Sequence, residues 1–291
     1  MRPSMRHNGH IVNSGEAPRR SRAESLAGTS PSRYPRAALI WLALAAWLLW
    51  FAWPGLLAWF TPDDLMNLHG IAFLGPWQIL SAKERPAANF VLKKLWEIFG
   101  LHPRPYRVFC FGLLLLNLWL AFRFFLKWTD SWRAALFAGL FFAYHAQLQD
   151  LYFSGGTLYD LLCFAFFFAA LAVAGPWIRS GARPSPGTLA AVAALSALAG
   201  GSKEIAVSLP SVLAAGALAW RTVRGAWPLV AASAASCWSV IAWTTWRAPM
   251  TANPAYQPEF NLAVLDARWK LLTADLLYRG PGWSSASAWT V

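Results

Sequence analysis

The chain has 291 residues, of which 57% are hydrophobic and 13% are charged, and it carries a formal net charge of +12. A soluble domain carries about a quarter charged residues, so this composition excludes a soluble enzyme and a disordered chain. The three cysteines, Cys110, Cys163 and Cys237, all lie inside apolar runs. Their placement argues against a disulfide scaffold and against a cysteine metal cluster.

Residues 1–36 are rich in Ser, Pro, Gly and Arg and show no apolar periodicity, which predicts a disordered basic tail. The first apolar run, 38–60, follows this long polar lead and has 23 residues. As a helix it would be about 34 Å long, enough to cross a hydrocarbon core of about 30 Å. The run is too long to be the apolar core of a secretory signal.

Further apolar runs follow, so the sequence predicts an all-α fold, a polytopic transmembrane helical bundle of about seven spans. The seven runs are 38–60, 108–126, 134–144, 161–178, 189–199, 205–220 and 227–246. The two runs on either side of Gly200 are open to two interpretations, either two separate spans or one broken helix. Trp residues flank many of the runs, as expected for an interfacial belt.

The polar segment between the first two spans, 61–107, has apolar residues at roughly helical spacing. This pattern predicts two short amphipathic helices lying at the membrane surface. The last segment of the chain is polar and contains no span. The predicted organisation is therefore a basic cytoplasmic tail (1–36), a membrane domain (37–247) and an outer polar segment (248–291).

The distribution of charge predicts the orientation of the bundle. With the tail in the cytoplasm and alternating spans, the cytoplasmic segments hold 14 basic and 3 acidic residues, a net charge of +11. The outer segments hold 11 basic and 10 acidic residues, a net charge of +1. An excess of Lys and Arg is typical of cytoplasmic loops, so we expect an integral membrane protein with a cytoplasmic N-terminus. No folded basic face is evident, which argues against a nucleic-acid partner.

Nearly all acidic residues beyond the tail lie on the predicted outer side, where polar groups at the membrane border usually serve a site or pair with one another. Asp63 and Asp64 follow Thr61 and Pro62 at the end of the first span. One interpretation is a helix N-cap, which accounts for one aspartate. The other is a catalytic base or a metal-binding pair, because a carboxylate can take a proton from an acceptor hydroxyl and a neighbouring carboxylate raises its pKa.

Lys203 and Glu204 separate two of the predicted spans. One interpretation is an ion pair between helix ends. The other, which we favour, is a phosphate site, because an ammonium group beside the free N–H groups of a helix start suits an anion. Arg85 is either a loop anchor or a second phosphate ligand.

His145 and Asp150, at the outer end of the third span, complete the candidate substrate-binding residues, although a single His near a helix end is more often structural. No zinc-binding His spacing is present, which argues against a zinc site, and the sequence names no metal ligand. Two carboxylates are able to hold a divalent ion, but no third ligand is evident. The cofactor requirement therefore stays open, a divalent metal ion included.

Four segments in this order resemble a family. Residues 60–64, Phe-Thr-Pro-Asp-Asp, resemble the acidic first-loop motif of GT-C glycosyltransferases, and 84–101 resemble an Arg-Pro to Phe-Gly-Leu stretch of their bacterial members. Residues 141–162 are similar to a segment in relatives of protein mannosyltransferases. Ser202-Lys203-Glu204 with Leu209-Pro210 resembles a further motif of the same family. The resemblance covers about residues 38–260.

The resemblance implies a membrane hexosyltransferase that moves a sugar from a polyprenyl-phosphate donor to an acceptor on the periplasmic side of a bacterial inner membrane, usually with inversion. It implies that Asp63 or Asp64 is the acidic catalytic residue and that Lys203 is a candidate contact to the lipid phosphate. The expected partners are the polyprenyl-phosphate sugar and membrane lipids. The segment 144–150 departs from the pattern, because Ala146 replaces a Pro after the His and Gln149-Asp150 replaces the Glu neighbourhood.

Two other functions remain open. A transporter or flippase of a lipid-linked substrate also needs charges at the membrane border, but it predicts charges deep in the spans and internal two-fold similarity, and the sequence has neither. The third hypothesis is a non-catalytic membrane protein fragment. GT-C enzymes usually continue with further spans, so we expect a truncated chain, either a fragment or an early-terminated reading frame.

Overall fold

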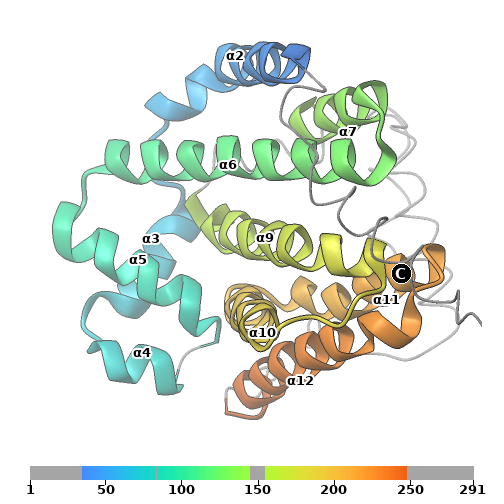
Figure 1. The fold of residues 1–291 in the computed structure, drawn as a ribbon. Helices are drawn as coiled ribbons and strands as arrows, with labels where there is room; N and C mark the ends of the chain where they lie inside the picture. Colours follow the sequence, from blue (N-terminus) through green and yellow to red (C-terminus); the bar gives the residue numbers. More distant parts are fainter. Residues whose placement is uncertain (1–34, 83, 145–154, 248–291) are drawn as a thin grey trace, which may run out of the picture.

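The computed structural model describes residues 35–82, 84–144 and 155–247. These residues form helices, with no strand among them, which confirms the predicted all-α class. The α-helices are α2 (Pro35–Leu57), α3 (Pro62–Ala72), α4 (Pro76–Ala82), α5 (Pro86–Phe99), α6 (Pro103–Thr129), α7 (Trp132–Tyr144), α9 (Leu158–Ser180), α10 (Pro186–Gly200), α11 (Leu209–Ala219) and α12 (Val223–Arg247). Two 3-10 helices, η3 (Gly155–Thr157) and η4 (Glu204–Ser208), precede α9 and α11 (Figure 1).

Four helices in the described chain are long and apolar enough to cross a membrane, so the protein is an integral, polytopic membrane protein. The four segments are Ala38–Leu57, Pro103–Thr129, Leu158–Ser180 and Val223–Trp246. The other three predicted spans correspond to apolar helices of 10–17 residues, namely Trp132–Phe141, Pro186–Gly200 and Glu204–Ala219. The 15 residues of α10 make a helix about 22 Å long, shorter than the hydrocarbon core.

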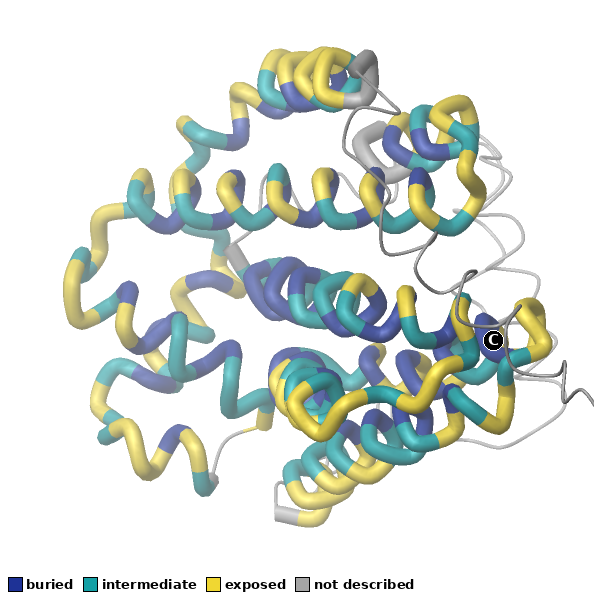
Figure 2. Tube along the Cα trace, viewed as in Figure 1, coloured by how far each residue is buried: buried dark blue, intermediate teal, exposed yellow. Residues whose placement is uncertain are grey.

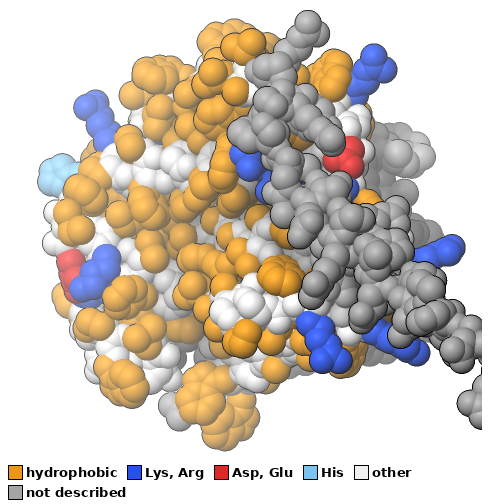
Figure 3. Space-filling view, in the orientation of Figure 1, with side chains coloured by type: hydrophobic (Ala, Val, Ile, Leu, Met, Phe, Trp, Pro, Cys, Tyr) orange, Lys and Arg blue, Asp and Glu red, His pale blue; other side chains and the backbone are white. Residues whose placement is uncertain are grey.

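Large apolar side chains point away from the bundle. Trp50 and Trp53 on α2 are 71% and 58% exposed, and Trp227 on α12 is 61% exposed. Hydrophobic side chains cover much of the visible face of the molecule in Figure 3. Soluble proteins rarely expose large contiguous apolar surfaces, whereas lipid chains cover such a surface without cost.

Helix α9 is the central helix of the bundle, and half of its apolar segment is buried, more than in the other three long helices (Figure 2). Its first residues lie beside α3 and α5, which we call the α9 N-terminal end. Its last residues contact the ends of α6 and α11: Arg179 donates to the Lys127 carbonyl, pairs with Asp130 at 2.9 Å and lies over the Trp220 ring. We call this second region the α9 C-terminal end.

The chain around Gly200 forms two helices of opposite direction. After α10 ends, Lys203 pairs with Asp160 in the first turn of α9. After α11 ends, the Thr222 hydroxyl donates to the Ile178 carbonyl near the end of α9 at 2.6 Å. Helix α11 therefore returns along α9, and of the two interpretations of this segment the structure has separate, antiparallel helices.

The first long loop contains three helices rather than the predicted two. Helix α4 lies between the two amphipathic segments and has only seven residues, too few to give a helical periodicity in the sequence. All three helices begin with a proline, Pro62, Pro76 and Pro86. Proline suits the first helical position because its fixed φ matches the helix and its missing N–H would have no partner there. These prolines are the signal that identifies α4.

Two hydrogen bonds between polar side chains and neighbouring helices cross the apolar interior. Asn117 on α6 is fully buried and donates from Nδ2 to the Leu161 carbonyl of α9 at 2.8 Å. The hydroxyls of Ser196 on α10 and Ser233 on α12 are 2.8 Å apart. In lipid, such bonds hold helices together because apolar contacts with lipid and with protein are nearly equivalent.

Candidate functional site

The start of α3 is a capping box built on the Thr-Pro-Asp-Asp segment. The Asp64 N–H donates to the Thr61 hydroxyl at 3.3 Å, and the Thr61 N–H donates to Asp64 Oδ2 at 2.9 Å. Each side chain thus satisfies a backbone donor of the other residue, which fixes where α3 begins. The N-cap interpretation is confirmed for one aspartate, Asp64.

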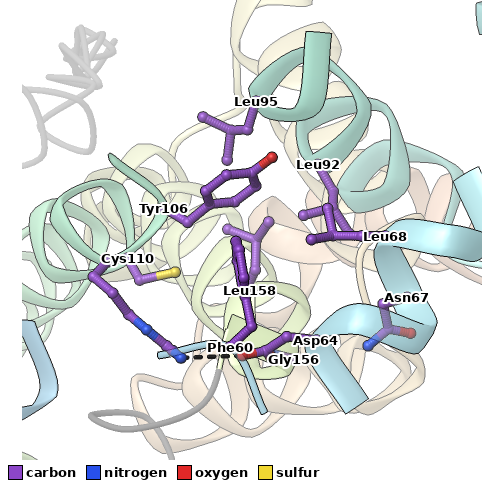
Figure 4. A pocket seen from close by; sticks show the side chains of 11 residues that line it. Phe60, Asp64, Asn67, Leu68, Leu92, Leu95, Tyr106, Cys110, Gly156 and Leu158 are labelled. Atoms are coloured by element: carbon purple, nitrogen blue, oxygen red, sulfur yellow. Dashed lines mark hydrogen bonds and ion pairs between the residues drawn. The ribbon is translucent and has the colours of Figure 1, made fainter. Parts of the chain in front are cut away.

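The Asp64 carboxylate is 4% exposed and has two further donors. Arg107 Nη2, from the first turns of α6, donates to its Oδ2 at 3.0 Å, and the Gly156 N–H donates to its Oδ1 at 2.6 Å. Figure 4 shows Asp64 beside Gly156. Arg107 also donates to the Trp59 carbonyl at 2.5 Å. The buried pair therefore joins α3, α6 and the start of α9.

A small cavity lies beside this pair (Figure 4). Its volume is about 10 Å³, and its walls include Asp64, Asn67, Tyr106 and Arg107. A cavity of this size holds about one water molecule. It is therefore too small for a sugar or a phosphate.

Asp63 differs from Asp64 both in exposure and in pairing. Its side chain is exposed at the first turn of α3. Within the described part of the chain it has neither a hydrogen bond nor an ion pair. Of the two aspartates, Asp63 is the one whose carboxylate is exposed and unpaired among the described residues.

A second group of polar side chains joins α5 to η4. Arg85 donates from Nε and Nη2 to the two oxygens of Glu204, at 2.9 and 3.1 Å. Arg85 is the N-cap of α5 and has a left-handed backbone with φ of 60°. Paired N–H groups that meet both carboxylate oxygens give a strong and oriented ion pair.

The first turn of α9 continues this group. The Arg85 guanidinium lies 5.2 Å from the centre of the Tyr159 ring, and the Tyr159 hydroxyl donates to Asn89 Oδ1 at 2.8 Å. Lys203 lies between α10 and η4, and its Nζ donates to Asp160 Oδ2 at 2.7 Å. We call Arg85, Tyr159, Asp160, Lys203 and Glu204 the polar network.

Two ion pairs set the electrostatics of the polar network. Burial alone would raise the pKa of Glu204, but the hydrogen bond and the charge of Arg85 outweigh burial and hold that pKa below its usual value. Burial likewise opposes the charged form of Arg85, and the Glu204 carboxylate outweighs it and raises the pKa of Arg85. The two cations and two carboxylates sum to zero formal charge, so an anionic ligand would compete with a carboxylate for Lys203 or Arg85.

The aspartate pair and the polar network lie at the same end of the bundle. Gly156, which binds Asp64, and Asp160, which binds Lys203, are four residues apart at the start of α9. This separation is about one helical turn. The structure therefore places Asp63, Asp64, Arg85, Lys203 and Glu204 at the same end of the bundle, the α9 N-terminal end. The cavity beside Asp64 is lined by none of Arg85, Lys203 and Glu204.

Two candidate residues, His145 and Asp150, lie outside the described residues. No group of three or more metal-ligating side chains occurs in the ranges that the structure describes. Two residues that organise the site, Arg107 and Asn89, were not singled out from the sequence. The signal for Arg107 is its position four residues after the proline that begins a long apolar helix, where an unpaired charge would be costly.

Comparison with known proteins gives no match for this chain among family models, curated proteins or solved structures.

Proposed function

We propose that this protein is a membrane glycosyltransferase of the GT-C type, which transfers a sugar from a polyprenyl-phosphate donor to an acceptor hydroxyl. The observation that carries the proposal is the placement of an exposed carboxylate, Asp63, and two partly exposed cations, Lys203 and Arg85, at one end of an otherwise apolar bundle. A polyprenyl-phosphate sugar has an apolar tail, an anionic phosphate and a polar sugar in that order. These parts would match the apolar helices, the two cations and the exposed carboxylate.

In the proposed reaction, the carboxylate of Asp63 removes the proton of the acceptor hydroxyl as its oxygen bonds to the anomeric carbon of the sugar. The bond between that carbon and the phosphate oxygen breaks, and polyprenyl phosphate leaves with the electron pair. Lys203 binds the donor phosphate after exchanging its contact with Asp160, and Arg85 is the second candidate ligand. Asp64 and Glu204 hold Arg107 and Arg85 in position.

We further propose that the α9 N-terminal end faces the outer side of a bacterial inner membrane and that the N-terminus is cytoplasmic. The opposite end supports this orientation, because its charged residues are mostly basic. Those residues are Arg123, Lys127, Arg133, Arg179, Arg183, Arg221 and Arg224, with Asp130 as an acidic partner. Lys and Arg concentrate in cytoplasmic loops.

Reconstituted protein tests the proposed activity with a radiolabelled polyprenyl-phosphate hexose and a membrane extract as the source of acceptors. A glycosyltransferase moves the label from the lipid to an acceptor and releases polyprenyl phosphate. A flippase carries the intact donor across the vesicle wall without breaking the sugar–phosphate bond. A non-catalytic protein does neither, and either of these last two results contradicts the proposal.

Lys203→Ala is expected to weaken donor binding by about tenfold to a hundredfold, because a hydrogen bond to a charged group contributes about 1.5–3 kcal/mol. Asp160→Asn is the matched control, since it removes the carboxylate that competes with the phosphate for Lys203. We expect this control variant to bind the donor as tightly as the wild type or more tightly. Equilibrium binding of the labelled donor measures both variants, and unchanged affinity in Lys203→Ala contradicts the phosphate role.

A further inference from the structure

An open apolar groove runs between α2 and α6, away from the candidate site. Its walls are Trp41, Leu115, Leu116 and Trp119, and its volume is about 360 Å³. Both helices are among the four that are long enough to cross a membrane. The groove therefore opens toward the hydrocarbon of the bilayer, where a lipid acyl chain is the available occupant.

Two cations extend from this groove toward the α9 C-terminal end. The Arg123 guanidinium lies 5.3 Å from the centre of the Trp119 ring, one of the groove walls. Lys127 follows one helical turn later, and both side chains are exposed. Arg123 is six residues before Thr129, the last residue of α6, which is a depth of about 9 Å at 1.5 Å per residue.

Neither cation has a carboxylate partner in the described chain, whereas nearby Arg179 pairs with Asp130. Two like charges at positions i and i+4 of a helix destabilise each other. Near the hydrocarbon border, unpaired charges are costly as well. An anion bound between Arg123 and Lys127 would remove both costs. If that anion is a lipid phosphate, the acyl chain of the same lipid can lie in the adjacent groove.

We propose that this groove is a binding site for one anionic phospholipid, with an acyl chain against Trp41 and Trp119 and the phosphate between Arg123 and Lys127. The aromatic wall supplies apolar contact, and the cation pair selects an anionic headgroup over a zwitterionic one. The site is at the opposite end of the bundle from Asp63 and Lys203. It is therefore independent of the proposed sugar transfer.

Native mass spectrometry of the detergent-solubilised full chain tests the proposal, with phosphatidylglycerol and phosphatidylcholine added separately. The wild type is expected to retain one phosphatidylglycerol in preference to phosphatidylcholine. Removing both cations in Arg123→Gln/Lys127→Gln is expected to cost about fivefold in phosphatidylglycerol affinity per cation. Arg133→Gln is the matched control, because Arg133 stacks on Trp132 in the same manner but lies on α7 and is not attached to the groove.

A third variant, Leu116→Trp, fills the groove without changing its charge and is expected to lower retention of the lipid. Added inorganic phosphate distinguishes a lipid site from a simple anion site, since we expect it not to displace phosphatidylglycerol at equal concentration. The proposal is overturned if the double variant retains phosphatidylglycerol as the wild type does, if Arg133→Gln loses as much affinity as the double variant, or if inorganic phosphate displaces the lipid.

Discussion

Arg107→Met is expected to lower the free energy of unfolding by about 3–5 kcal/mol, the usual cost of leaving one partner of a buried ion pair without the other. Arg107 and Asp64 have side chains only 2% and 3% exposed, and their closest atoms are 3.0 Å apart. Methionine is of similar length but leaves the Asp64 carboxylate buried without its counter-charge. Thermal unfolding of the purified protein in detergent, followed by the loss of helical signal, measures the effect.

Arg104→Gln is the matched control for this prediction. Arg104 lies one turn earlier on α6, but its side chain is exposed and has no ion pair in the described chain, so its replacement should have little effect on unfolding. A double-mutant cycle also tests the interaction between Arg107 and Asp64. In an Asp64→Asn background, the loss caused by Arg107→Met should be smaller, because no carboxylate is left unpaired. Equal losses in both backgrounds would show that the pair does not organise the fold.

Asp63→Asn is expected to reduce sugar transfer by about a hundredfold or more, since a positioned general base contributes about 10²–10⁴ to a rate. It should leave thermal unfolding unchanged, because Asp63 is exposed and has no partner in the described ranges. Asp63→Glu retains a carboxylate and should keep part of the activity. The labelled-donor assay and the unfolding experiment together provide the two readouts.

The neighbouring variant, Asp64→Asn, should behave differently. It disturbs the capping box, the Arg107 pair and the Gly156 contact, so we expect lower stability together with lower activity. A folded and fully active Asp63→Asn protein would contradict the role of Asp63. A stable but inactive Asp64→Asn protein would transfer the catalytic role to Asp64.

The positions of the long helices could be predicted from the sequence because each apolar run reports directly on burial in lipid or protein. Helix lengths were harder to predict. The run at 189–199 fits a span or a shorter helix equally well. In the structure α10 has only 15 residues, from the turn after the Ser185 N-cap to Gly200. The third helix of the first loop was missed because the seven residues of α4 give no periodicity.

The candidate site was partly predictable for a similar reason. Charges at the ends of apolar runs are visible in the sequence, so Asp63, Asp64, Lys203 and Glu204 stood out. Arg85 was also a candidate, but its pairing with Glu204 was not predictable, and Arg107 was not singled out, because pairing depends on contacts between residues far apart in the chain. Arg85 meets Glu204 across 119 positions and Arg107 meets Asp64 across 43. The different states of Asp63 and Asp64, one exposed and one buried, likewise follow from where α6 and α9 pack.

The proposed function requires the α9 N-terminal end to lie on the outer side of the membrane. The three native cysteines are buried, so single cysteines can be introduced at two exposed positions, Glu84→Cys beside the polar network and Ala182→Cys after the end of α9. With a membrane-impermeant maleimide applied to intact cells whose inner membrane is accessible, we expect labelling at position 84 at once and at position 182 only after the membrane is opened. Labelling of both positions from the same side, or the reverse order, would contradict an outward-facing site.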